Sequence, residues 1–436
     1  MASRLSLVSS RDFVIFIGDF ALKKHALFRT LFSLKGNPRA CIYTEPLWGI
    51  PFNLYSPYVS VYMLAIGLTD ANIGLIVSIS WGFQVIFALL SGAITDKVGR
   101  RLTTLIFDIL AWSLPALISA LAQNFWFFLT AAVINSAWRV THNSWTCLLV
   151  EDADEHDLVD IYTWIHIANQ LVGLVAPLAG IVIGIYSLVP TMRGLYFFAA
   201  IMFAVKAIVT YIFTEETEQG KIRLEETRLE SVFSVFSGYG QVVRNILQTP
   251  ETLYTAAIIL IISITQMVTG SFWAIILTEK LNIPNQNLAY FPFIRSMVIL
   301  AFFFAIMPRI SKLHFKIPMV VGFLGFLLSQ ILLVTAPAQN YAYLIISTLL
   351  EASSFAVVSP LVDKMVVLTI AAKERARIQS IMYVGIILIT SPFGWIVGKL
   401  SEMDKTFPFL LNTFLFATGA LLAYLAGHLS LREKSV

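Results

Sequence analysis

Ionisable and amide side chains lie inside long apolar stretches of this sequence, where they are costly and therefore informative. The stretch "INSAWRVTHNSWTC" (134–147) carries Asn135, Arg139, His142 and Asn143. Their spacing of i, i+4, i+7 and i+8 places them on one face of a helix. A guanidinium there can hold an anionic or hydroxyl-bearing group, and an imidazole can titrate near neutral pH. We predict a cavity face that binds a ligand. The alternatives are a structural network with neighbouring helices, or an Arg139 that reaches the inner headgroups.

A second candidate is Glu351, which lies halfway along the apolar stretch around "LLEASSFAVV". An apolar environment favours the protonated form of a lone carboxylate unless a cation meets it. Glu351 is therefore predicted to be a protonatable coupling residue, or a partner of Arg139 or Arg295. A permanently paired structural carboxylate is the alternative. Arg295 and Lys206 lie nearer the ends of their stretches. Arg295 is a further candidate for the cavity, whereas we expect the Lys206 amine to extend to the membrane surface.

Three amides complete the predicted binding surface. Asn53, Gln84 and Gln266 each lie in an apolar stretch, and a buried amide needs a hydrogen-bonding partner. No Ser/His/Asp elbow, metal-spaced His set or Gly-rich nucleotide loop accompanies these residues, so an enzyme is not expected. The sequence predicts no cofactor, no metal site and no nucleic-acid partner.

The composition identifies the elements that position these residues. Of 436 residues, 58% are hydrophobic and 13% are charged, with a mean hydropathy of +0.79. Soluble domains carry about a quarter charged residues, so we predict an all-α polytopic membrane protein. The two cysteines, Cys41 and Cys147, offer neither a disulfide framework nor a metal site.

Hydropathy predicts twelve transmembrane helices in two six-helix bundles. The bundles cover residues 46–213 and 252–428, and a charged cytoplasmic linker (214–251) joins them. Residues 1–45 form an N-terminal segment with a possible interfacial helix at 12–22, and residues 429–436 form a tail. The predicted spans are 46–67, 71–95, 102–122, 124–149, 160–186, 191–213, 252–277, 287–308, 317–336, 339–363, 374–398 and 406–428.

Basic residues fall unequally on the two sides of this topology. The predicted outer loops hold only Arg193, Lys280, Lys399 and Lys405, whereas the inner segments are rich in Lys and Arg. This asymmetry predicts that both termini are cytoplasmic. The two halves also share a short repeat, "VAPLAGIVIG" (175–184) and "TSPFGWIVG" (390–398), at corresponding positions. Transporters of this size use such repeats to build a central site.

The predicted inner loop "GAITDKVGRR" (92–101) makes the assignment specific. With twelve helices and a charged linker, it resembles the major facilitator superfamily of secondary transporters, whose signature in this loop is roughly G-x-x-x-D-[RK]-x-G-R-[RK]. The resemblance covers about residues 46–428. The residues that match the signature are Gly92, Asp96, Lys97, Gly99, Arg100 and Arg101.

The resemblance implies a latch that closes the inner side. Gly92 would let the second helix approach the other half, and Asp96 would bond across the contact, for example to the start of the eleventh helix. We expect Asp108 to join this latch by answering the loop cations. Alternatively, the three cations serve only the orientation.

The resemblance also implies alternating-access transport of a small molecule across a lipid bilayer. "APLAG" (176–180) resembles part of a drug-exporter signature and favours proton-coupled export. We further expect a functional monomer in a bacterial-type plasma membrane. Proton-coupled uptake of a sugar, organic anion or other nutrient is the alternative. A transporter-like sensor without flux is a remote one.

Overall fold

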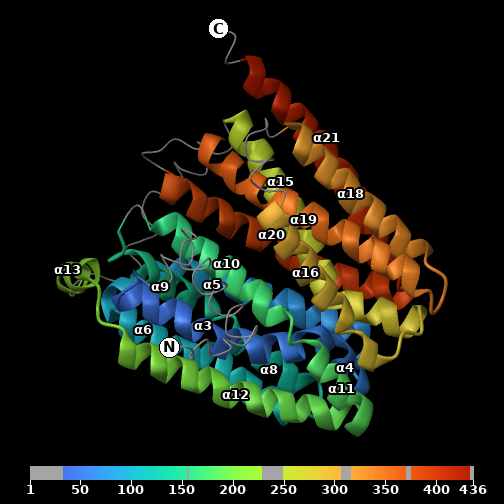
Figure 1. Ribbon diagram of the computed structural model, residues 1–436, viewed down its shortest axis with the longest axis horizontal. Coiled ribbons are helices and arrows are strands. Elements are labelled where there is room, and N and C mark those ends of the chain that lie inside the picture. The colour runs from blue at the N-terminus through green and yellow to red at the C-terminus, as the bar shows by residue number, and fades with distance from the viewer. Residues whose placement is uncertain (1–32, 155–156, 228–248, 306–315, 370–374, 433–436) are drawn as a thin grey trace, which may run out of the picture.

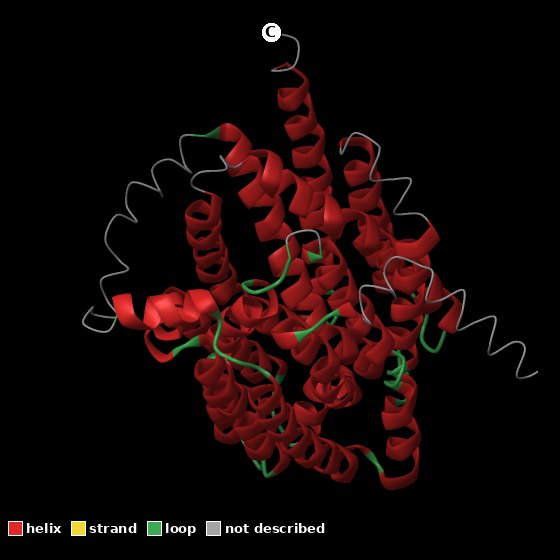
Figure 2. Cartoon of the chain, turned by 60° about the vertical axis from the view of Figure 1, so that its left-hand side comes forward, coloured by secondary structure: helices red, strands yellow, loops and turns green. Residues whose placement is uncertain are grey.

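The chain folds almost entirely into helices. The computed structural model describes residues 33–154, 157–227, 249–305, 316–369 and 375–432, and no strand occurs in those ranges (Figure 2). The predicted all-α class is confirmed for these residues. The predicted interfacial helix at 12–22 and much of the linker lie outside them.

Two groups of helices diverge toward the end of the molecule that carries the short helix α13 (Glu218–Glu226), as Figure 1 shows. Following the predicted orientation, we call that end the inner end and the opposite end the outer end. The N-terminal group contains α3 (Gly36–Tyr55), α4 (Val59–Ala65), α5 (Asp70–Val98), α6 (Arg100–Asp108), α7 (Leu114–Ala120), α8 (Phe125–Asn135), α9 (Trp138–Val150), α10 (Leu158–Gly173), α11 (Pro177–Tyr186) and α12 (Leu188–Phe213). The C-terminal group contains α15 (Pro250–Ile275), α16 (Tyr290–Ala305), α18 (Lys316–Thr335), α19 (Tyr341–Thr369), α20 (Arg375–Met403) and α21 (Phe407–Arg432).

Nine helical stretches of the described residues are long and apolar enough to cross a membrane. They coincide with nine of the twelve predicted spans. The other three predicted spans fall on α3 with α4, on α8 with α9, and on α16. The first two are each divided between two helices, and the described part of α16 ends at Ala305. For these three, spanning stays a prediction.

Helix α3, on which the first predicted span falls, begins at Gly36, earlier than the predicted position 46. The side chain of Asn37 holds this extension against the end of α12, because its amide accepts from the backbone N–H of Glu215 at 2.8 Å and donates to the Glu215 carbonyl at 3.0 Å. Hydropathy misses this segment because its fixed position depends on polar contacts with a distant part of the chain.

Several predicted single helices are interrupted. Between α6 and α7 the backbone forms a π-helix, Ile109–Ser113, and the Asn135 amide donates to the Ala111 carbonyl within it at 2.6 Å. The predicted 124–149 helix breaks between α8 and α9, and the predicted 160–186 helix breaks before Pro177. Such irregular turns redirect the side chains that follow them.

The buried apolar side chains show where the two groups meet. One cluster combines residues of both groups, among them Ile73 and Ile76 of α5 with Val397 of α20. A second cluster lies within the C-terminal group and includes the stacked rings of Phe326 and Phe416, 4.7 Å apart. A third lies within the N-terminal group. The shared core joins the groups, and their inner ends are left to diverge.

Candidate functional site

A cavity of about 850 Å³ lies between the two helix groups. The N-terminal group contributes residues of α3, α5 and α9, and the C-terminal group contributes residues of α15, α16, α18, α19, α20 and α21. Five of the predicted ligand or coupling residues line it: Asn53, Arg139, Gln266, Arg295 and Glu351. The tertiary structure therefore brings together five side chains from five different helices. The sequence pattern identified each of them only separately.

Arg139 is held in the cavity wall by neutral groups. Its Nε donates to the Gln84 side-chain oxygen at 3.0 Å, and its guanidinium lies over the Trp138 ring at 4.1 Å from the centroid. Gln84 is itself buried, so Arg139 is the partner that its amide needs. No ion pair joins Arg139 to a carboxylate among the described residues. A desolvated guanidinium in this state favours an anionic ligand.

Arg295 and Glu351 form an ion pair in the opposite wall. The Arg295 Nε lies 2.9 Å from a Glu351 carboxylate oxygen, and the guanidinium also lies 4.7 Å from the Phe355 ring centroid. Of the alternatives open for Glu351, the structure shows the pairing with Arg295 and not with Arg139. The pair is partly exposed to the cavity, so a ligand or a proton can reach it.

The predicted polar face around Arg139 is divided in the structure. Asn135 belongs to α8 and supports the π-helix, and the Asn143 amide donates to the Thr95 hydroxyl of α5 at 3.1 Å. The His142 ring stacks on Trp138 at 5.6 Å, with its Nδ1 3.3 Å from the Thr146 hydroxyl. These three residues are not part of the cavity lining. The break before α9 separates Asn135 from Arg139, and the Asn143 side chain is directed to α5.

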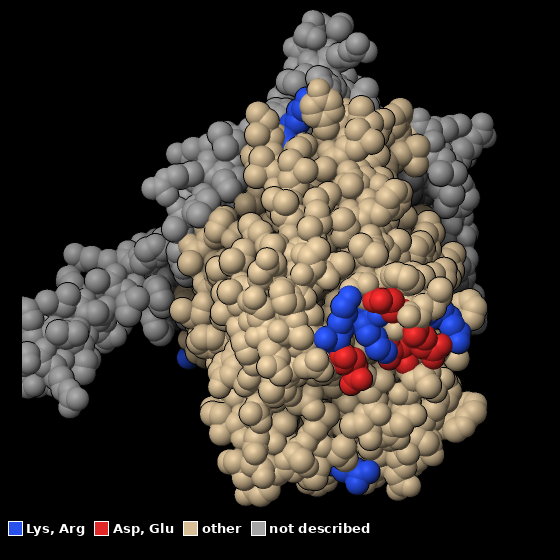
Figure 3. Space-filling view, turned by 90° about the vertical axis from the view of Figure 1, so that its right-hand side faces the viewer, with Lys and Arg blue, Asp and Glu red and all other residues tan. Residues whose placement is uncertain are grey.

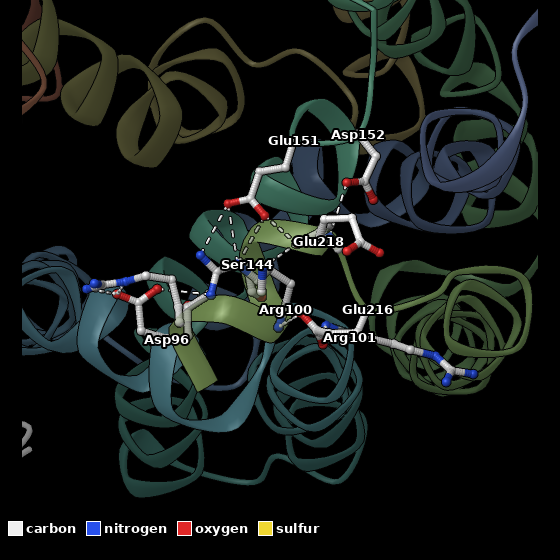
Figure 4. A network of polar contacts seen from close by, with 12 residues as sticks. Asp96, Arg100, Arg101, Ser144, Glu151, Asp152, Glu216 and Glu218 are labelled. Atoms are coloured by element: carbon white, nitrogen blue, oxygen red, sulfur yellow. Dashed lines mark hydrogen bonds and ion pairs between the residues drawn. The ribbon is translucent and has the colours of Figure 1, made fainter. Parts of the chain in front are cut away.

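The 92–101 segment, predicted as a loop, consists of the end of α5, Gly99 and the start of α6, and it builds a network of ion pairs at the inner end (Figure 4). Asp96 contacts the guanidinium of Arg100 and that of Arg223 from α13, each at 2.9 Å. Arg100 also pairs with Glu151 at the end of α9, at 3.1 Å. The hydrogen bond to Asp96 raises the pKa of Arg223 above its usual range. The 92–101 segment is thereby bound to α9 and to α13.

The start of α6 is capped by Glu216, which precedes α13. Its carboxylate accepts from the backbone N–H groups of Arg100 at 2.8 Å and Arg101 at 3.1 Å, which are unpaired donors at a positive helix terminus. Gly99 has φ of +91°, and a Cβ there would lie 2.7 Å from the Glu216 carboxylate. The motif glycine therefore serves both the turn and the close approach of the cap. Arg101 donates to the Tyr211 carbonyl at 2.9 Å.

Sequence reasoning missed Glu151, Glu216 and Arg223 because they lie far from the motif along the chain. An acidic 151–160 segment and a charged linker that begins at 214 beside a basic loop were the available signals. The described contacts of Asp96, Arg100 and Arg101 lie in the N-terminal group, in α13 and in the residues just before α13. Gly92 has open space around it, and Lys97 is exposed. The expected contact of Asp96 with the start of the eleventh helix stays a prediction, because residues 370–374, where that helix was predicted to begin, lie outside the described residues.

Asp108 lies apart from the motif network, which differs from the expectation that it answers the loop cations. It pairs with Lys206 of α12 at 2.6 Å and accepts from the Thr141 hydroxyl at 2.6 Å. Both members of the pair are buried, so the expectation that Lys206 extends to the membrane surface is wrong. Packing of α6 against α12 brings the opposite charges together inside the protein, where pairing is needed.

At the outer end, α5 and α20 touch through their glycines. A Cβ on Gly74 would overlap the Gly394 carbonyl oxygen and lie 2.8 Å from the Gly398 Cα. Beside this contact, the Ser78 hydroxyl accepts from the Trp395 N–H at 2.6 Å. Backbones can approach this closely only where both helices carry small residues.

Polar contacts seal the same outer end. Asp70 at the start of α5 accepts from the Lys405 amine at 2.7 Å and from the Ser401 hydroxyl, which joins the two groups. Figure 3 shows a mixed acidic and basic cluster on this otherwise weakly charged face. Asp404 lies 3.8 Å from Lys280, and hydrogen bonds from the Thr406 hydroxyl and amide lower its pKa.

The two copies of the sequence repeat, 175–184 and 390–398, each contact the opposite helix group. In α11, a Cβ on Gly180 would overlap the backbone carbonyl of Gln286, which precedes α16. The first copy of the repeat thus packs on the C-terminal group, while the second copy, with Gly394 and Gly398, packs on the N-terminal group. The two copies make equivalent closures of the outer end.

Replacing Asp96 with Asn tests the inner network. The change removes the ion pairs with Arg100 and Arg223, and partly exposed pairs each contribute about 0.2–1 kcal/mol. We expect the free energy of unfolding to fall by about 1 kcal/mol and trypsin to cut α13 several-fold faster. Glu226→Gln is the control, since Glu226 binds Arg223 at 2.8 Å without touching the 92–101 segment. Equal cleavage of both variants and wild type would show that Asp96 does not hold α13.

Comparisons with known proteins agree with this architecture. A family model described as Major Facilitator Superfamily matches residues 48–383. A comparison with the sequences of curated proteins finds no match.

Three solved structures illustrate the likeness of fold. The nucleoside transporter NupG aligns with a TM-score of 0.66 and 14% identity over 89% of this chain and 98% of that one. A POT family transporter in complex with 5-aminolevulinic acid aligns with 0.67 and 15% over 91% and 98%. The human organic anion transporter MFSD10 (TETRAN) aligns with 0.61 and 16% over 92% and 100%. Together with the family match, the two helix groups and the cavity between them have one explanation: this multi-pass membrane protein belongs to the major facilitator superfamily of transporters.

Proposed function

We propose that this protein is a proton-coupled secondary transporter of a small organic anion, working by alternating access with both termini in the cytoplasm. The observation that carries the proposal is Arg139, a guanidinium in the cavity wall whose partners among the described residues are a neutral amide and an indole. A cation held without a carboxylate is ready for the anionic group of a ligand. Asn53 and Gln266 supply further hydrogen bonds from both groups.

The ion pair in the opposite wall supports coupling to a proton. Protonation of Glu351 would weaken its bond to Arg295 and free that guanidinium for the same ligand. Binding of the anion and binding of the proton would then favour each other. This links the charge of the cargo to the proton gradient without any further group.

Alternating access is supported by where the two groups touch. The outer end is closed by glycine contacts and by Asp70 with Lys405, and the groups diverge at the inner end. We propose that the 92–101 segment serves as the latch in the conformation with a closed inner end, where Gly92 and Asp96 would meet the C-terminal group.

The direction of transport is a separate matter. The exporter-like "APLAG" stretch favoured export, but its Gly180 packs against the Gln286 backbone, which gives this glycine a structural role that does not depend on direction. The proposal therefore concerns cargo and coupling. NupG and the POT transporter are named for nucleosides and for a complex with 5-aminolevulinic acid, which makes both nutrient classes suitable members of a test panel.

Purified protein in liposomes with an imposed pH gradient tests the proposal. The panel contains monocarboxylates, dicarboxylates, phosphorylated sugars, short peptides and nucleosides, each with the gradient in both orientations. We expect accumulation of an anionic member that collapses when the gradient is removed. In Glu351→Gln we expect uphill accumulation to be lost while downhill exchange remains.

Two outcomes would contradict the proposal. Transport restricted to neutral nucleosides, unaffected by the gradient, would remove both the anion and the coupling. Binding of a panel member to the protein without any flux would instead identify a transporter-like sensor.

A further inference from the structure

Three ionisable side chains are buried together inside the N-terminal group, outside the cavity lining. Glu45 of α3, Asp108 of α6 and Lys206 of α12 are 9%, 3% and 5% exposed. The Lys206 amine lies 2.6 Å from one Asp108 oxygen, and the other oxygen accepts from Thr141 at 2.6 Å. Glu45 follows Thr44, whose hydroxyl lies 2.9 Å from the Thr210 hydroxyl one turn after Lys206 on α12, and this contact places α3 beside the pair.

In the part of the chain that the structure describes, the other groups in contact with this cluster add no second cation. Cys41 on α3 lies within electrostatic range of the lysine and both carboxylates. Helix α9 contributes the Thr141 hydroxyl and the Trp145 indole, whose ring centroid is 5.8 Å from the Lys206 amine. Lys206 is thus the one cation that the described contacts place at the cluster.

Counting charges shows why this arrangement takes up a proton. Two ionised carboxylates with one ammonium leave a net negative charge in a low-dielectric interior, which is costly. One added proton makes the cluster neutral. Asp108 already has the direct contact with Lys206 and a hydroxyl donor, both of which favour its ionised form, so the proton falls to Glu45.

We propose that Glu45, Asp108 and Lys206 form a proton-binding site, in which Lys206 keeps Asp108 ionised and Glu45 carries the proton. Binding forms one O–H bond on the Glu45 carboxylate with a proton taken from water, and release reverses it. This site is distinct from the Arg295–Glu351 pair and lies in the other helix group.

A series of indoles connects the site to the cavity. Trp48 on α3 contacts Trp112 edge-on at 5.1 Å, and Trp112 lies in the π-helix that directly follows Asp108. The Trp112 and Trp138 ring centroids are 6.4 Å apart, and the guanidinium of Arg139 lies over the Trp138 ring. A change of charge at the site therefore acts on the helices that position the anion-binding arginine, and π-helices are frequent at functional sites.

Infrared difference spectroscopy of the full-length protein in liposomes, with isotope-labelled glutamate, tests the site directly. Exposed glutamates ionise at about pH 4.3, so a protonated glutamate carbonyl band that persists at about pH 7 reports a protected proton. We expect this band in wild type, its loss in Glu45→Gln, and its retention in Glu351→Gln. A wild-type spectrum without the band, or a band removed by Glu351→Gln instead, would overturn the proposal.

Asp108→Asn provides the sharper test because it leaves Glu45 in place. Without the competing carboxylate, Lys206 is free to pair with Glu45, so the glutamate ionises and the band is lost. Asp96→Asn, in the inner network, is the matched control and keeps the band. A band unchanged in Asp108→Asn would mean that burial alone protonates Glu45 and would refute the shared site. Either Glu45→Gln or Asp108→Asn suffices if the other does not fold.

These spectra need no transported molecule. Their outcome is therefore independent of whether the protein carries an organic anion, and failure of one proposal leaves the other standing.

Discussion

Replacing Arg139 with Gln lowers the apparent affinity for the transported anion about 100-fold. The guanidinium lies in a partly dehydrated cavity wall, where loss of a charge-assisted contact costs about 3 kcal/mol. Each 1.4 kcal/mol corresponds to about tenfold in affinity. Gln keeps hydrogen-bonding capacity but not charge, so the loss isolates the electrostatic contribution. The measurement is concentration-dependent uptake into liposomes of the anion that the panel identifies.

Two further variants at arginine positions make this result specific. Arg139→Lys restores the charge without the planar fork, and we expect about a tenfold loss. Arg193→Gln is the control, since Arg193 donates to the Ala122 carbonyl at 3.2 Å, outside the cavity lining. Wild-type affinity in Arg139→Gln, or an equal loss in Arg193→Gln, would remove Arg139 from the binding site.

Replacing Gly74 with Ala opens the outer end. The added methyl group overlaps the backbone of α20 at Gly394 and Gly398, and backbone atoms cannot turn aside as a flexible side chain can. Overpacking of this kind costs about 1–3 kcal/mol. The equilibrium between conformations should therefore shift about 5- to 150-fold away from outer closure. Distances between spin labels at Asn72 and Met403 report the outer end, and labels at Lys97 and Lys364 report the inner end.

A second glycine of the same helix provides the control. A Cβ on Gly92 meets no atom within 4 Å in this conformation, so Gly92→Ala leaves the outer closure intact. If the 92–101 segment is a latch, this variant instead disfavours the closed inner end, and the two glycines shift the equilibrium in opposite directions. Outer distances that stay at wild-type values in Gly74→Ala would contradict the proposed role of the glycine contact.

Both the predictions that succeeded and those that failed have physical reasons. Apolar runs of about 20 residues identified helices because each residue contributes independently to hydropathy. Hydropathy did not predict that α3 begins at Gly36, because polar contacts of Asn37 with Glu215 stabilise this start. Of Asn135, Arg139 and Asn143, which were predicted to share a cavity face, only Arg139 lines the cavity. A helix break separates Asn135 from Arg139, and Asn143 contacts a neighbouring helix. Periodicity assumes an uninterrupted helix, and it carries no information on packing partners.

The sequence by itself determined the membrane class, the family and the identity of the costly polar residues. A buried Arg139, Glu351 or Asp108 must find a partner, and composition alone shows that the partner is needed. The tertiary structure decided which partner each one finds: Glu351 meets Arg295, Asp108 meets Lys206, and Arg139 meets no carboxylate among the described residues. Ion pairing depends on contacts of a few ångströms between helices far apart in the chain, and only packing sets those distances.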